Sequence, residues 1–109
     1  MSNPYETADD LADSLTLTKI SHRDSAAGAW VSGTIAGHRF DALVFPEHAE
    51  SETYELGTSK ISKLWVQRLS DKTTVVNFDR GWDVRATDDL ATRIVDFLAA
   101  GLADTVFGN

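Results

Sequence analysis

The C-terminal part of the chain carries a long amphipathic pattern, and this pattern constrains the fold more than any other feature of the sequence. Thr87 is predicted to be the helix N-cap, with Asp88 and Asp89 in the first turn, where carboxylates interact favourably with the helix dipole. The apolar residues that follow recur at helical spacing on one arc: Leu90, Ala91, Ile94, Val95, Phe97, Leu98 and Leu102. The residues predicted on the opposite side are Thr92, Arg93, Asp96 and Ala103. Such a wide apolar arc must be buried, so the rest of the chain has to supply the surface that covers it.

The segment Trp30–Phe45 predicts a β-hairpin that turns at Ala36–Gly37. Glycine supplies the positive φ that a tight hairpin turn requires. Alternate residues of the second arm share a face, and the set predicted on the core side is His38, Phe40, Ala42 and Val44. Pro46 then ends the strand, and burial is the favoured environment for Trp30.

Two further segments complete a predicted sheet. Ile61–Arg68 and Thr73–Phe78 form a second hairpin, and Leu15–His22 alternates with period 2 and is rich in β-branched residues. The predicted fold class is therefore α+β, with an antiparallel sheet of about five strands in hairpin pairing and the C-terminal amphipathic helix packed on one face. A length of 109 residues suits one domain, which we place at residues 15–109. The acidic segment at residues 1–14 precedes it as a short helix or a tail.

The charged residues are unevenly distributed, and the chain carries a formal charge of −7. Residues 47–59 lack apolar periodicity, which predicts a loop that is long for a compact domain. Because a net negative charge repels phosphates, direct nucleic-acid binding is not expected. The acidic side chains of this loop instead suit a protein partner with a basic surface: Glu47, Glu50, Glu52 and Glu55. The alternative is that these side chains only keep the protein soluble.

Several classes of chemistry lack their residues or their spacing in this sequence. The chain has no cysteine, which excludes disulfides and thiolate metal sites. His22, His38 and His48 match no ligand spacing, so no metal site is predicted, and the first two are expected to be half-exposed on strands. The glycines form no phosphate-binding run, so no cofactor is predicted. Without an apolar run that could span a membrane or a signal peptide at the start, the expected location is the cytoplasm.

The densest group of chemically versatile residues lies at Asn77–Asp83, where a strand leads toward the C-terminal helix. Arginine and tryptophan are enriched at interaction hot spots, so we predict a partner-binding corner formed by Asp79, Arg80, Trp82 and Asp83. The competing interpretation is structural, with Trp82 closing the end of the core and Arg80 paired with Asp79 or Asp83. A third interpretation makes the corner a small-molecule or ion site that uses its paired carboxylates.

Three segments follow one another in a recognisable order: Trp30-Val-Ser-Gly-Thr-Ile-Ala-Gly-His-Arg-Phe40, Ile61-Ser-Lys-Leu-Trp-Val66 and Phe78-Asp-Arg-Gly-Trp-Asp83. Over about residues 29–100, the chain resembles a family of short uncharacterised proteins from phages and other mobile elements of bacteria. These proteins tend to have Gly-Arg where this chain has Ser59-Lys60. The resemblance implies a genomic context rather than a reaction. Small acidic proteins of that context often bind and block host machinery, including restriction and CRISPR complexes.

We therefore expect a non-catalytic, acidic protein-interaction module, and more specifically an inhibitor of a host defence complex of the anti-CRISPR or anti-restriction type. The alternative is a small enzyme or ligand-binding module centred on Asp79–Asp83. The chain is expected to act as a monomer or a homodimer, without a metal or a cofactor. A concave site with converging polar groups favours the enzyme, whereas an exposed charged face favours the interaction module.

Overall fold

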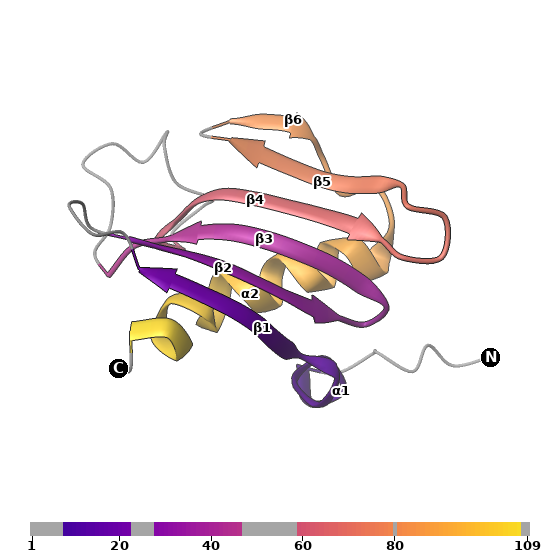
Figure 1. Cartoon of the computed structure of the whole chain (residues 1–109). Helices are drawn as coiled ribbons and strands as arrows, with labels where there is room; N and C mark the ends of the chain where they lie inside the picture. Colours follow the sequence, from indigo (N-terminus) through magenta and orange to yellow (C-terminus); the bar gives the residue numbers. More distant parts are fainter. Residues whose placement is uncertain (1–7, 23–27, 47–58, 80, 108–109) are drawn as a thin grey trace.

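The computed structural model of the protein describes residues 8–22, 28–46, 59–79 and 81–107. In chain order, the elements are α1 (Ala8–Ser14), β1 (Thr16–His22), β2 (Ala29–Ile35), β3 (His38–Val44), β4 (Ile61–Arg68), β5 (Thr74–Asp79), β6 (Trp82–Val84) and α2 (Asp89–Phe107). The strands are neighbours in the same order, and every neighbouring pair is antiparallel. Helix α2 lies across one face of this sheet, which we call the inner face, and no described helix covers the opposite, outer face (Figure 1).

This architecture confirms the predicted α+β fold, with strands in hairpin order and the C-terminal helix on one face. The sheet has six strands rather than about five, because part of the predicted polar corner forms β6. Trp82 of β6 lies opposite Phe78 of β5, and the two rings pack edge to face with their centroids 5.2 Å apart. The predicted long loop lies outside the described residues except for its last residue, Ser59.

The hydrophobic core lies between the inner face and α2. The buried residues of α2 are Ala91, Ile94, Val95, Leu98, Leu102 and Ala103. The core side chains on β2, β3 and β4 include Val31, Ile35, Phe40, Ala42, Val44, Leu64 and Val66. The predicted core side of β3 is confirmed, but the prediction that Ala103 faces away from the core is wrong. Alanine fits either side of a helix, so apolar spacing alone does not place it.

Helix α2 begins one residue later than predicted. The backbone N–H of Ala91 donates to Asp88 Oδ1 at 2.7 Å, which makes Asp88 the N-cap and corrects the assignment of Thr87. The Thr92 hydroxyl adds a second bond to this turn by donating to the Asp88 carbonyl at 2.9 Å. Aspartate is at least as good an N-cap as threonine, so the adjacent residue takes the role.

The β2–β3 hairpin turns at the predicted place, and α1 supports the turn. Ala36 and Gly37 both adopt positive φ, at 50° and 75°. The backbone N–H of Ala36 donates to Ser14 Oγ, at the end of α1, at 3.0 Å. Leu11 of α1 is 3% exposed and joins the core, so the short N-terminal helix is packed into the domain.

Candidate functional site

The outer face of the sheet collects aromatic and charged side chains from the central strands. The strand register places them in rows that run across the sheet. One row, from β2 to β5, is Trp30, Leu43, Lys63 and Asp79. The next row is Ser32, Asp41, Trp65 and Asn77. Because successive side chains of a strand point to opposite faces, these rows alternate with the buried residues and point away from α2.

Trp30 is the largest exposed apolar side chain on this face, with 43% of its surface accessible. The expectation that it is buried was wrong. It alternates with Ala29 and Val31, which are both fully buried, so its position in the strand fixes it to the outer face. The indole of Trp30, the second residue of β2, is therefore in contact with solvent or with a partner on one side.

Trp30 and Lys63 form a bridge over β3. The Lys63 ammonium lies 5.9 Å from the centroid of the Trp30 ring, within the range of a cation–π interaction. Leu43 lies between these two residues in the register and is only 4% exposed, although it points to the open side of the sheet. We infer that the Trp30 indole and the aliphatic part of the Lys63 side chain shield Leu43 from solvent.

Trp65 is held in place more firmly than Trp30. Its Nε1–H donates to Thr74 Oγ1 on β5 at 3.3 Å, and its side chain is half-buried. The guanidinium carbon of Arg39 lies 6.0 Å from the centroid of the Trp65 ring. The hydrogen bond fixes the orientation of the indole, and the ring face carries a loosely bound cation.

Two carboxylates of this face have long contacts with the same two cations. Asp79 Oδ1 lies 3.6 Å from Lys63 Nζ, and Asp41 Oδ2 lies 3.9 Å from Arg39 Nη2. Both distances exceed a hydrogen bond, and exposed pairs of this kind contribute little stability. Asp41 also accepts a hydrogen bond from the hydroxyl of Ser32 at its other oxygen, Oδ1. The outer face therefore presents carboxylates whose bonding to lysine and arginine is weak.

A shallow hollow of about 140 Å³ lies among these groups. The outer-face residues that line it are Trp30, Asp41, Lys63, Trp65, Asn77 and Asp79. Two indoles, two carboxylates, an amide and an ammonium thus converge on one small depression. It is smaller than the roughly 300–1,000 Å³ of pockets that bury cofactors and drug-sized ligands.

The structure divides the predicted partner-binding residues. Asp79 lines the hollow, whereas Trp82 packs against Phe78 at the edge of the core, as the structural interpretation proposed. The guanidinium carbon of Arg85 lies 5.2 Å from the centroid of the Trp82 ring, and Asp83 is exposed in β6. The remaining predicted residues lie outside the described part of the chain: Glu47, Glu50, Glu52, Glu55 and Arg80.

The residues that sequence reasoning missed are on the outer face: Arg39, Asp41, Lys63 and Trp65. A signal for them exists in the sequence. In β2 and β4, aromatic, charged and polar residues occupy every second position, and the positions between them are buried. Favouring burial for Trp30 hid this alternation.

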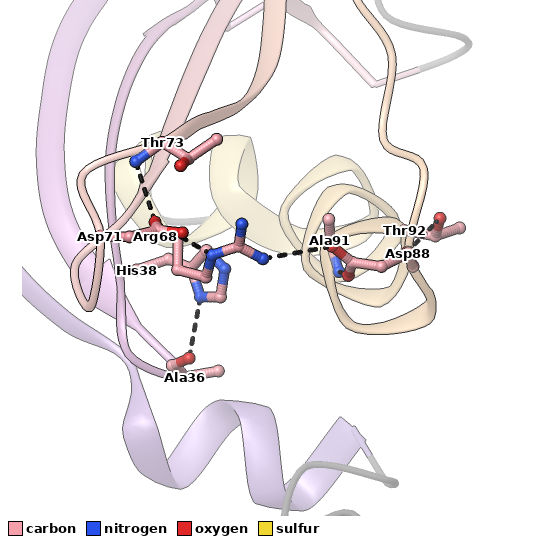
Figure 2. Close-up of polar contacts among 8 residues, drawn as sticks. All are labelled: Ala36, His38, Arg68, Asp71, Thr73, Asp88, Ala91 and Thr92. Atoms are coloured by element: carbon pink, nitrogen blue, oxygen red, sulfur yellow. Dashed lines mark hydrogen bonds and ion pairs between the residues drawn. The ribbon is translucent and has the colours of Figure 1, made fainter.

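A second polar cluster links the β4–β5 turn to the start of α2 (Figure 2). Arg68 Nε donates to Asp71 Oδ1 at 3.2 Å, and the Thr73 N–H donates to the same oxygen at 3.0 Å. Both bonds lower the pKa of the Asp71 carboxyl from its ordinary value of 3.8 to about 2, and the bond from Arg68 has the larger effect. The same contact raises the pKa of Arg68. Since Arg68 Nη1 also lies 4.0 Å from the N-cap carboxylate of Asp88, the cluster ties a turn to a helix end, which is a structural role.

His38 lies beside this cluster, opposite Arg68 in the register, and it is 4% exposed. The expectation of a half-exposed histidine was wrong here, because His38 belongs to the same inner face as Phe40. Its Nδ1 lies 2.9 Å from the Ala36 carbonyl, so this nitrogen carries the proton and donates (Figure 2). This hydrogen bond connects His38 to the β2–β3 turn on the inner face of the sheet, where His38 is buried.

Among the described residues, no group of three or more histidine, aspartate or glutamate side chains is arranged to hold a metal ion. No helix in the described ranges combines the length and the apolar character needed to cross a membrane.

Comparison with known proteins gives the chain a family. No curated protein and no solved structure matches it. A family described as Domain of unknown function (DUF7678) matches residues 29–103, which run from the start of β2 well into α2. The matched range contains every residue that lines the outer-face hollow. Because the match covers more than half of the chain, the protein belongs to this family, Domain of unknown function (DUF7678).

Proposed function

We propose that the protein is a non-catalytic protein-interaction module and that the outer face of its sheet contacts the partner. The observation that carries this proposal is the 43% exposure of Trp30 on the face opposite α2. Tryptophan and arginine dominate binding energy at protein interfaces, and this face holds two tryptophans and Arg39. Exposed apolar patches mark interaction sites, and here the two indoles lie together around one hollow.

The proposed partner is a protein with a basic surface. The chain carries a net charge of −7, which attracts a basic partner and speeds association with it. The described charged residues of the outer face include Lys19, Arg39 and Lys63 as well as Asp41 and Asp79, so charges of both signs are mixed on this face rather than gathered into the positive patch that a phosphate backbone requires. The acidic side chains of residues 47–55 enter the proposal through their charge alone.

From the resemblance to proteins of phages and mobile elements, we further propose that the partner belongs to a host defence complex in the cytoplasm. The protein would then act as an inhibitor of the anti-CRISPR or anti-restriction type. Such an inhibitor needs affinity for a protein surface and no catalytic group. The small volume of the hollow favours this function over the alternative of a small enzyme.

The proposal is tested by affinity capture from a bacterial host lysate, with quantitative mass spectrometry of wild type and Trp30→Ala. The matched control is Leu69→Ala, because Leu69 is similarly exposed, at 46%, and lies in the β4–β5 turn. We expect a specific protein that is enriched by wild type and by the control and is lost with Trp30→Ala. Thermal melting of each variant verifies its folding. Equal enrichment by all three proteins would contradict the proposal.

The contribution of the acidic residues at 47–55 is tested separately. Changing all four glutamates, Glu47, Glu50, Glu52 and Glu55, to glutamine removes charge and nearly preserves shape. If these residues face a basic partner, the variant should associate more slowly at low salt and should melt as the wild type does. If capture were unchanged at both low and high salt, these glutamates would not contact the partner and would only keep the protein soluble.

A further inference from the structure

We infer that the hollow on the outer face receives an arginine side chain of the partner protein. This inference rests on the proposed function and names the group by which the partner is recognised. Four properties of the hollow support it: the charge of its lining, its aromatic walls, its size and the weak pairing of its present charges.

The charge of the lining favours a cation. Three charged residues line the hollow, namely Asp41, Asp79 and Lys63, so the described lining has a net negative charge. The indoles of Trp30 and Trp65 also line the hollow, and the face of an indole carries the negative side of its ring quadrupole. A carboxylate or phosphate of a partner would meet two like charges and the one ammonium of Lys63, whereas a cation meets two opposite charges, two indoles and that one like charge.

The size and shape of the hollow favour a single side chain, and arginine over lysine. A volume of about 140 Å³ is well below the roughly 300–1,000 Å³ of pockets that hold cofactors, so it suits one side chain. A guanidinium is flat, stacks on an indole and donates a fork of hydrogen bonds to a carboxylate. Asp41 lies directly opposite Trp65 in the strand register, and Trp30 on β2 and Asp79 on β5 complete the lining from either end.

The chain already places its own cations against these groups, but loosely. Lys63 Nζ stands 3.6 Å from Asp79 and 5.9 Å from the Trp30 ring. The distance to Asp79 is longer than a hydrogen bond, and the distance to the Trp30 ring is near the limit of a cation–π interaction. A partner arginine that hydrogen-bonds Asp79 directly can therefore displace Lys63. This makes Lys63 an internal competitor of the ligand, and its removal should strengthen binding of a cation.

The experiment uses the whole protein and the acetylated, amidated tripeptide Gly-Arg-Gly as the probe. The same tripeptide with citrulline, which is nearly the same shape but neutral, is the matched control. Binding is followed by the NMR signals of the indole N–H groups. The expected result is a saturable shift of the Trp30 and Trp65 signals with the arginine peptide and none with the citrulline peptide.

Two variants should change the affinity for the arginine peptide in opposite directions. Lys63→Gln should bind the arginine peptide about two- to fivefold more tightly, and Asp79→Asn should bind it more weakly by a similar factor, as expected for exposed charge pairs. Lys72→Gln, which removes an exposed lysine of the β4–β5 turn, controls for the change in net charge. Asp41→Asn is the second carboxylate variant, and unchanged spectra of the remaining residues verify folding.

Opposite results would overturn the inference. A Gly-Glu-Gly peptide that binds instead, with weaker binding in Lys63→Gln, would make the hollow an anion site. The absence of a shift with the arginine peptide at its highest soluble concentration would show that the hollow takes no guanidinium. In that case, partner capture that still depends on Trp30 would leave the proposed interaction surface standing, because capture is measured independently of the peptide.

Discussion

The packing of α2 on the inner face leads to a quantitative prediction for Leu98→Ala. Leu98 is 1% exposed and lies in the middle of α2, against the core of the sheet. Truncation of a buried leucine removes the transfer free energy of its methyl groups and leaves a cavity, at a total cost of about 2–5 kcal/mol. A site near the middle of a long helix that spans the sheet collapses poorly, so we expect about 3 kcal/mol.

This free energy corresponds to a large change in melting temperature. An unfolding entropy of about 2.1 cal/mol/K per residue gives about 0.23 kcal/mol/K for 109 residues, so Tm should fall by about 13 °C. Urea titration followed by circular dichroism should show a lower midpoint with an unchanged m value. Asp96→Ala, on the exposed side of the same helix, is the control and should change stability by less than about 0.5 kcal/mol. If Leu98→Ala were no more damaging than this control, α2 would not pack on the sheet as described.

Further predictions concern the backbone, the β4–β5 turn and nucleic acid. Gly33→Ala should lower stability by about 1–3 kcal/mol in thermal melts, because the added Cβ meets the Thr16 carbonyl oxygen and lies 3.0 Å from the Phe40 ring. Gly101→Ala, whose Cβ meets open space in a helix, should be neutral or stabilising, and equal effects of the two changes would contradict the close approach at Gly33. The lowered pKa of Asp71 means that its ionised form stabilises the fold above about pH 4 and that this contribution is lost as pH falls toward about 2. The difference in Tm between wild type and Asp71→Asn should therefore be largest near neutral pH and should vanish only below about pH 2, whereas a pH-independent difference would exclude this ion pair as its cause. The protein should not shift random duplex DNA at physiological salt, and a salt-sensitive submicromolar shift would refute the charge argument.

The parts of the fold that follow from local patterns were predictable from the sequence. The apolar arc of α2 and the alternation in β3 each have a strong period, and Ala36–Gly37 marks the hairpin turn. The errors lie where neighbouring residues compete or where a residue suits two environments. Asp88 and Thr87 both make good N-caps, and Ala103 fits either side of a helix.

The candidate site was harder to predict, because it depends on which face of the sheet the helix covers. Trp30 and Trp65 are large and apolar, so composition favours the core, yet their register assigns them to the outer face. Lys63 and Asp79 come from different strands, and only the pairing of β4 with β5 brings them together. Asp79 was found from sequence as a member of a dense cluster, but its partner across the sheet was not.

The central claim, that the partner lies over the outer face, is tested most directly by site-specific photo-crosslinking. A benzophenone amino acid replaces Thr34, on the outer face beside Ser32 and opposite Arg39, and in a second protein it replaces Asp96 on the exposed side of α2. Each protein is irradiated with the host protein that wild type captures and Trp30→Ala does not. The account predicts a covalent product from position 34 and none from position 96. A product from position 96 alone would place the partner on the helix and contradict the claim.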